Sequence, residues 1–224
     1  MSTVLLDQEI EIPTIQNLQD FRYWALSAKF PGHGRIDYIS GRIEVNMSPE
    51  DLFTHGTLKF QLASRIEDRL AELDLGHGFC GETRISSVPA DLSAEPDVVV
   101  VSYEAVDSGR VRLIPKTSKQ EGRYTEIEGG PDFVAEIVSD SSVAKDTRRL
   151  PKAYFAAGVR EFWLIDARGD ELIFQIHHRG PTSFIAAETD AEGYQQSTVL
   201  DGYYLLERER HARGHWVYRL RLKA

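Results

Sequence analysis

Cysteine is almost absent from the sequence, which contains a single residue of this type, Cys80. A single thiol cannot form an internal disulfide, whereas secreted proteins of this kind often carry several cysteines. We therefore expect an intracellular protein. Cys80 has no histidine or second cysteine at the spacing of a metal site, so we expect it to be a small buried hydrophobic residue and not a catalytic thiol.

Long apolar stretches are also missing. No segment approaches the ~18 consecutive apolar residues that a membrane-spanning helix requires. The N-terminal segment up to Glu11 is polar and acidic, which is unlike a signal peptide. These absences predict a cytoplasmic protein without a membrane segment.

Positive charge is in deficit, since 26 lysines and arginines face 35 aspartates and glutamates, for a net charge of −9. This balance argues against broad, unspecific binding of nucleic acid, which depends on neutralising phosphates. It leaves room for a local basic surface. The sequence also lacks a glycine-rich phosphate loop, a serine nucleophile elbow and zinc-ligand spacing, so those three kinds of site are excluded.

The residues that are present have the composition of an ordinary globular protein. The 224 residues are 42% hydrophobic and 27% charged, which is enough for one well-filled core. Neither an internal repeat nor a linker divides the chain. We therefore expect residues 1–224 to form a single domain.

The spacing of apolar residues predicts alternating helices and strands. The clearest helix covers residues 54–73, and a second covers about 146–157 and ends at Gly158. Strands are expected at 79–88, 96–103, 133–139, 160–166 and 172–177. A short helix over 14–29 and a hairpin over 35–47 come first, residues 104–130 are expected to be irregular, and hairpin-like strands come last. This order predicts an α/β fold in which helices flank a mixed β-sheet.

Two carboxylates interrupt otherwise apolar strands. Glu136 lies in the middle of Phe133–Ser139, whose two faces are apolar in the manner of a buried strand. Asp97 follows a proline and directly precedes four valines. A buried carboxylate costs several kcal/mol unless it is paired, protonated or bound to a metal. If the two strands are neighbours, both acids can share a hard divalent cation.

A structural explanation also exists for each acid taken alone. Glu136 could pair with a basic residue of the following helix, and Asp97 could cap a turn. The presence of both acids at the ends of strands in a plausible sheet favours the metal site over this explanation.

The same segments resemble the Uma2 family, whose members are restriction-endonuclease-like proteins of the PD-(D/E)XK nuclease superfamily. The resemblance depends on the Pro-Asp before the valine run and on the segments Pro131–Ser139 and Tyr154–Asp166, and it covers about residues 36–174. It implies a restriction-endonuclease-like core with a mixed β-sheet flanked by helices. An N-terminal hairpin and C-terminal strands would be additions to this core.

The resemblance also implies a chemistry. A Mg²⁺ or Mn²⁺ ion would be bound by Asp97 and Glu136, with the carbonyl of Ile137 as a further candidate ligand. Phosphodiester bonds, most plausibly in DNA, would be hydrolysed by water bound to that ion. A homodimer is the expected assembly, because restriction-like nucleases commonly act as dimers.

The sequence departs from the superfamily pattern at the lysine. The pattern is Glu-x-Lys, but isoleucine and valine follow Glu136. The family often carries a lysine four residues before the tyrosine, where this chain has Leu150. We predict Lys152 as the catalytic lysine, although two residues on an ideal helix are ~200° apart unless Pro151 bends the segment. Lys145 is the other candidate.

Two further residues match the family more loosely. Asp37 occupies an acidic position of the family, where it could be a third ligand or could only buttress the hairpin. His55 opens the long helix and could reach the site, although we favour a helix-end or packing role.

Three functions follow from these observations. The leading hypothesis is a metal-dependent DNA endonuclease. The missing lysine and the net charge of −9 keep open a nuclease-like module that binds nucleic acid, or regulates, without hydrolysis. A third hypothesis is a protein–protein interaction domain whose aromatic C-terminal strand pairs with a second copy.

Overall fold

The computed structural model describes residues 11–116 and 121–223. Its helices are α1 (Leu18–Ala25), α2 (Thr57–Leu73), α3 (Tyr103–Asp107) and α4 (Leu150–Ala157), and single π-helical turns, Leu52–Gly56 and Lys145–Arg149, precede α2 and α4. Its strands are β1 (Arg35–Ile39), β2 (Arg42–Asn46), β3 (Gly76–Cys80), β4 (Arg84–Ser87), β5 (Leu92–Ala94), β6 (Val98–Ser102), β7 (Val111–Pro115), β8 (Tyr124–Gly129), β9 (Phe133–Ile137), β10 (Glu161–Asp166), β11 (Ile173–Arg179), β12 (Phe184–Ala186), β13 (Gln195–Ser197), β14 (Gly202–Arg210) and β15 (Trp216–Lys223).

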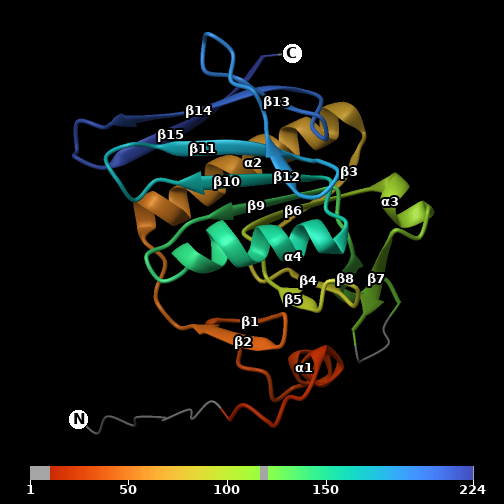
Figure 1. Cartoon of the computed structure of the whole chain (residues 1–224). Helices are drawn as coiled ribbons and strands as arrows, with labels where there is room; N and C mark the ends of the chain where they lie inside the picture. The colour runs from red at the N-terminus through yellow and green to blue at the C-terminus, as the bar shows by residue number, and fades with distance from the viewer. Residues whose placement is uncertain (1–10, 117–120, 224) are drawn as a thin grey trace, which may run out of the picture.

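The described strands form three sheets (Figure 1). The central sheet has the order β12-β11-β10-β9-β6-β3, a second sheet has the order β2-β1-β5-β4-β8-β7, and the third has the order β13-β14-β15. Strand β9 runs parallel to β10 and antiparallel to β6. The central sheet is therefore mixed, as the alternation of helices and strands predicted.

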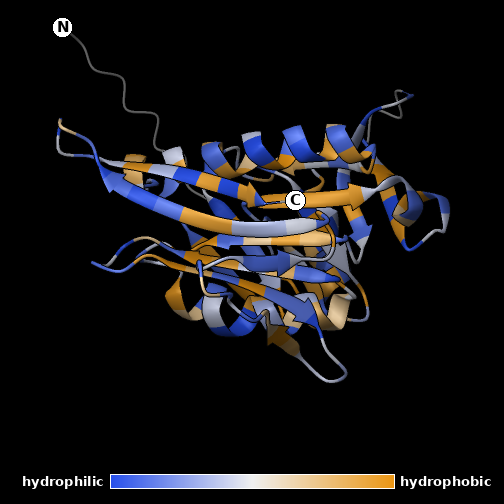
Figure 2. Ribbon diagram, turned by 90° about the horizontal axis from the view of Figure 1, so that it is seen from above, coloured by the Kyte–Doolittle hydropathy of each residue, from blue (hydrophilic) through white to orange (hydrophobic). Residues whose placement is uncertain are grey.

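The central sheet is apolar on both faces because its strands alternate between two cores. Val98 and Val100 pack on one side with the leucine stripe of α2 and with β14 and β15. Val99 and Val101 pack on the other side with α4 and the second sheet. Helix α4 lies in front of the central sheet in Figure 1 and α2 lies behind it, and Figure 2 shows helices on both sides of the strands.

Helix α2 forms where the sequence predicted it. Its buried residues Leu58, Leu62, Ile66 and Leu70 recur every fourth position and line one face. The helix ends at Leu73 because Asp74 adopts the left-handed conformation, with φ at 48°.

The prediction of an irregular segment over residues 104–130 is wrong for the part that the structure describes, which contains α3, β7 and β8. Strand β8 pairs in parallel with β4, and Ile127 lies opposite Ile85 in this pairing. The polar Glu126 hid this strand in the sequence. In the fold, Glu126 is buried and accepts a hydrogen bond of 2.8 Å from Arg22 Nε of α1.

The predicted strand over residues 79–88 is divided into β3 and β4 by Gly81, which has a φ of 77°. Cys80 ends β3, the outer strand of the central sheet, and its side chain is exposed. The prediction that Cys80 is buried is therefore wrong, because an edge strand leaves its end uncovered.

A buried glutamate fastens the third sheet to the central one. Glu161 of β10 accepts hydrogen bonds from Trp163 Nε1 (2.8 Å), from the Ser197 hydroxyl (2.5 Å) and from the Thr198 amide (2.8 Å). These hydrogen bonds, together with His178 Nε2 at 3.8 Å, satisfy the buried carboxyl group, and no lysine or arginine of the described chain is paired with it.

Across residues 11–116 and 121–223, no helix has the length and apolar character needed to cross a membrane. The segment before residue 11, which the sequence predicted not to be a signal peptide, lies outside the described residues.

Candidate metal centre

Asp97 and Glu136 lie on the same face of the central sheet. The antiparallel register of β6 and β9 places Val98 opposite Ala135, so the next positions, Asp97 and Glu136, are also opposite one another. Both acids share the side of Val99, which packs toward α4. Their side chains have no exposed surface. The sheet thus places two buried carboxyl groups side by side at the end of β6.

Asp97 is surrounded by donors and cations. Its Oδ2 accepts a hydrogen bond of 2.8 Å from the Ile137 amide, and His55 Nε2 lies 3.4 Å from the same oxygen. Its Oδ1 lies 2.8 Å from Arg35 Nη2 and 3.4 Å from Lys59 Nζ. Burial alone would raise the pKa of Asp97, but these partners hold it well below its usual range. Asp97 is therefore ionised at neutral pH.

Glu136 is less well satisfied. Its Oε1 accepts a hydrogen bond from the Tyr154 hydroxyl of α4. Its Oε2 has no hydrogen-bond partner among the described residues, and Arg35 Nη1 lies 4.0 Å away. Burial raises the pKa of Glu136 well above its ordinary value, and the nearby charges of Asp146 and Asp97 raise it further. The contact of Glu136 with a cation, Arg35 at 4.0 Å, is thus longer than the 2.8 Å contact between Arg35 and Asp97.

A third buried acid, Asp146, adjoins Glu136. It lies in the π-helical turn before α4, where the Ser142 hydroxyl donates to Oδ2 and Oδ1 has no partner in the described chain. Burial raises its pKa to about 6, against the opposing effect of Lys145. Sequence reasoning missed Asp146, because an acid at the start of a helix usually interacts with the helix dipole at the surface.

The two candidate lysines have different surroundings. Lys145 is buried, and its Nζ lies 2.8 Å from Asp37 Oδ2. Burial would lower its pKa, but the charges of Asp37 and Glu136 raise it.

Lys152, the predicted catalytic lysine, is exposed on α4 at the wall of a different cavity of about 310 Å³. Tyr154 of the same helix points to Glu136. A residue two positions away on a helix points roughly the opposite way, so the structure does not bring Lys152 to the two acids.

Arg35 is the cation that contacts both acids, and the sequence did not single it out. It begins β1, the first strand of the hairpin, where an arginine normally indicates only a solvated edge. Its guanidinium lies 2.8 Å from Asp97 and 4.0 Å from Glu136, and its side chain is 18% exposed. Burial alone would lower the pKa of Arg35, but the two acids raise it. A positive group therefore occupies the space between the carboxylates.

Glu50 extends the acidic cluster toward solvent, and the buried His55 lies between Glu50 and Asp97. One ligand atom each from Glu50, His55 and Asp97 lies within 4.8 Å of the other two, which makes these residues the one group in the described part of the chain with metal-ligand spacing. Burial would lower the pKa of His55, but Asp97 and Glu50 raise it to about 9. Contact with His55, followed by Lys59, lowers the pKa of Glu50 to about 2 despite partial burial.

His55 and Asp37 both contact other residues of the centre. His55 lies in the turn that opens α2 and also reaches Asp97. Asp37 uses both oxygens within the protein, because Oδ1 accepts from the Glu95 amide at 3.0 Å and Oδ2 contacts Lys145. Asp37 thus connects the hairpin to the turn before α4.

A cavity of about 240 Å³ adjoins the acids. Asp97 and Glu136 do not line it, but the basic residues that contact Asp97 do, namely Arg35, His55 and Lys59. The lining carries three basic side chains, Arg35, His55 and Lys59, and three acidic ones, Glu50, Glu82 and Glu95. A substrate that approaches through this cavity therefore meets charges of both signs.

Comparison with known proteins identifies the family. A family model described as "Uma2: Putative restriction endonuclease" matches residues 18–207. The chain belongs to the Uma2 family. No curated protein matches it.

A solved structure similar to this Uma2 protein is described as "Crystal structure of a putative nuclease belonging to DUF820 from Anabaena variabilis ATCC 29413". The TM-score is 0.56 at 19% sequence identity, over 83% of this chain and 90% of that chain. At this identity the likeness concerns the fold, and it confirms the predicted restriction-endonuclease-like α/β architecture. The acids and cations of the centre all lie inside the segment that matches Uma2.

Proposed function

We propose that this Uma2 protein is a divalent-metal-dependent endonuclease that hydrolyses phosphodiester bonds in DNA. The observation that carries the proposal is the approach of two fully buried carboxylates, Asp97 and Glu136, to one guanidinium, Arg35. Burial of an ionised acid costs several kcal/mol of desolvation free energy. Coordination of a divalent cation by both acids would offset that cost.

The residues fit a hard divalent cation. Glu136 Oε2 and Asp146 Oδ1 are buried without hydrogen-bond partners in the described chain, so the centre holds more carboxylate oxygen than its own donors satisfy. Such oxygens are the preferred ligands of Mg²⁺ and Mn²⁺. We assign Asp97 and Glu136 as the ligands, with Glu50 as a further acid close to Asp97. When bound, the ion would lower the pKa of water and stabilise negative charge on phosphorus oxygens.

The protein side chains would orient the reacting groups. Tyr154 donates to Oε1 of Glu136 and thereby fixes the carboxylate with its other oxygen toward Arg35. Arg35 and Lys59 line the cavity and can bind the non-bridging oxygens of a phosphate. Arg35 would thus supply the cation that the absent Glu-x-Lys lysine supplies in the superfamily pattern. Lys145, held by Asp37, balances the charges of Glu136 and Asp146.

The test is nicking of supercoiled plasmid DNA in Mn²⁺ by the wild type, Asp97→Asn and Glu136→Gln. Glu207→Gln on the exposed part of β14 is the matched control. We expect both site variants to fall to background and the control to cleave normally. Equal cleavage by all four proteins would refute the assignment of the site.

The second candidate function is a nuclease-like module that binds DNA without cutting it. One observation favours it, namely that Arg35 already occupies the space between the acids. Mn²⁺ binding with no cleavage by the wild type would select this alternative.

A homodimer belongs to the same proposal, since a dimer would bring one centre to each strand of a duplex. Strand β15 is at the edge of the third sheet, where a second copy could add a strand. Sedimentation equilibrium of the full chain would test this assembly, and a monomer at all concentrations would refute it.

A further inference from the structure

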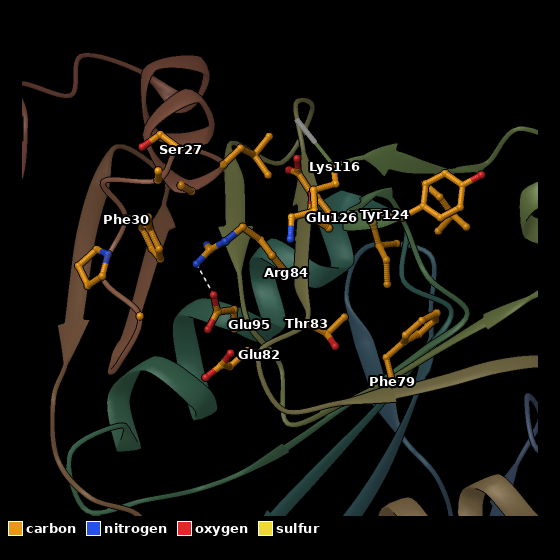
Figure 3. Close-up of a pocket in the computed structure, with 18 of the residues that line it drawn as sticks. Ser27, Phe30, Phe79, Glu82, Thr83, Arg84, Glu95, Lys116, Tyr124 and Glu126 are labelled. Atoms are coloured by element: carbon orange, nitrogen blue, oxygen red, sulfur yellow. Dashed lines mark hydrogen bonds and ion pairs between the residues drawn. The ribbon is translucent and has the colours of Figure 1, made fainter. Parts of the chain in front are cut away.

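A large cavity adjoins the candidate metal centre. It has a volume of about 1030 Å³ and lies between the segment after α1 and strands β4, β7 and β8 (Figure 3). Gly34, Glu82 and Glu95 line both this cavity and the smaller one beside the acids. The two cavities therefore meet, and a ligand in the larger one would extend from the centre.

Aromatic side chains form opposite walls of the large cavity. Phe30 lies on the α1 side, whereas Phe79 and Tyr124 lie across from it (Figure 3). Phe30 and Phe79 are half-buried, and Tyr124 is 53% exposed. Phe30 already packs against Trp24 and the Arg84 guanidinium. Tyr124, with Phe79, therefore offers the face on which a flat heterocycle can stack. Stacking of this kind is the main sequence-tolerant contact to unpaired bases.

The arginine on the floor between these walls is already engaged. Arg84 is buried, donates to the Ser93 hydroxyl (3.2 Å) and the Ile36 carbonyl (3.1 Å), and pairs with Glu95. Its guanidinium also lies 5.0 Å from the centre of the Phe30 ring. Because its donors are used, Arg84 is poorly placed to bind a phosphate.

The charge of the lining favours a neutral base over a phosphate as the ligand of this cavity. Three glutamates line the cavity, Glu82, Glu95 and Glu126, against two basic residues, Arg84 and Lys116. Glu95 is paired with Arg84 and Glu126 with Arg22, so the lining offers no excess of positive charge to bind a phosphate. A neutral base would be tolerated, and its exocyclic amines could donate to the Glu82 carboxylate.

We propose that this cavity receives an unpaired nucleobase adjacent to the phosphate at the metal centre, so that the preferred nucleic acid is single-stranded or locally unpaired. Bases within a duplex are stacked and paired, and they enter a pocket only after extrusion, which costs least where pairing is already absent. The cleavage preference that follows rests on the proposed function, whereas the binding of the base does not.

Binding can be measured by fluorescence anisotropy with the full-length wild type in EDTA, where no metal is present. The probes are a labelled duplex, the same duplex with a three-nucleotide bulge, and the same bulge without bases. We expect the bulge with bases to bind about tenfold more tightly than the abasic bulge, as base–aromatic stacking allows. The phosphate number is equal in the two bulges, so the difference reports on the bases alone.

Variants locate the effect in the cavity. Tyr124→Ala should weaken binding of the bulge with bases about tenfold and leave the abasic bulge unchanged. Tyr23→Ala is the matched control, because Tyr23 is 81% exposed on α1 and does not line the cavity. An RNA bulge of the same sequence distinguishes the two sources of an unpaired base.

Equal binding of the two bulges, equal effects of the two tyrosine variants, or no binding of any probe would each overturn the inference. Failure of the proposed function gives a different result. Base-dependent binding without Mn²⁺-dependent cleavage would retain the cavity assignment and refute the nuclease. Cleavage of plain duplex with no preference for unpaired positions would do the reverse.

Discussion

Replacement of Arg35 by methionine should destabilise the metal-free protein and enlarge the stabilisation that Mn²⁺ provides. The guanidinium lies 2.8 Å from Asp97 and 4.0 Å from Glu136, and both acids are fully buried. Methionine fills similar space but brings no charge. The variant therefore leaves two carboxyl groups without the cation that lies between them.

The magnitude follows from the burial. Removal of one partner of a buried ion pair costs about 3–5 kcal/mol, and the partial exposure of Arg35 argues for the lower end, about 3 kcal/mol. Each kcal/mol shifts the midpoint of a domain of this size by about 2–4 °C. In EDTA, Arg35→Met should therefore melt about 6–12 °C below the wild type.

Manganese should reverse much of this loss. A ligand at 100 times its dissociation constant stabilises the folded state by about 2.7 kcal/mol. In the wild type the ion has to displace the guanidinium, whereas in the variant it meets only carboxylates. The midpoint of Arg35→Met should therefore rise by about 5–10 °C on saturation, and that of the wild type by less.

The assay is differential scanning calorimetry in EDTA and across a MnCl₂ titration. Arg42→Met is the matched control, since Arg42 is exposed on the neighbouring strand β2 and should shift the midpoint by no more than about 2 °C. Equal stabilisation of the wild type and Arg35→Met by Mn²⁺ would refute the idea that metal and guanidinium share one position.

Three further predictions concern other residues of the chain. Lys145→Met should slow plasmid nicking much more than Lys152→Met, because only the former lysine is buried beside the acids; equal initial rates would contradict this. Glu161→Gln should lower the thermal midpoint by about 6–12 °C, because three or more buried donors lose a charged acceptor worth about 3 kcal/mol. Glu207→Gln at the surface should leave the midpoint unchanged. Similar midpoints for the two variants would show that the buried hydrogen bonds contribute little. The pKa of His55 is about 9 in the folded metal-free protein, above its ordinary value of 6.5. Protonated His55 therefore stabilises the folded state fully below pH ~6.5, and this contribution to the free energy of unfolding is lost as the pH rises through ~9. Urea unfolding should show this loss, and it should vanish in His55→Gln; an unchanged slope in that variant would assign the loss to another group.

The parts of the fold that the sequence predicted are those with strong local periodicity. The stripe of α2 and the apolar run of β9 report burial directly, because a helix repeats near every fourth residue and a strand every second. Strand β8 was missed because its burial depends on pairing with β4 and on the ion pair of Glu126 with Arg22. Neither contact is visible in the residues next to β8.

In the candidate centre, too, some residues could be recognised from the sequence and others could not. Asp97 and Glu136 could be recognised because charged residues stand out in apolar strands. Lys152 was predicted because it lies two residues from Leu150, where the family often carries a lysine. Helix α4 turns Tyr154 toward Glu136, which directs Lys152 away. Lys145, by contrast, lies in the π-helical turn before α4 and contacts Asp37.

The sequence by itself determined the family, the buried strands and the two acids, since all three are written in local patterns of residue type. Only the tertiary structure decided which cations meet those acids. Arg35, His55 and Lys145 come from separate elements, and their charges act over a few ångströms of space, a separation that the order of residues along the chain does not encode.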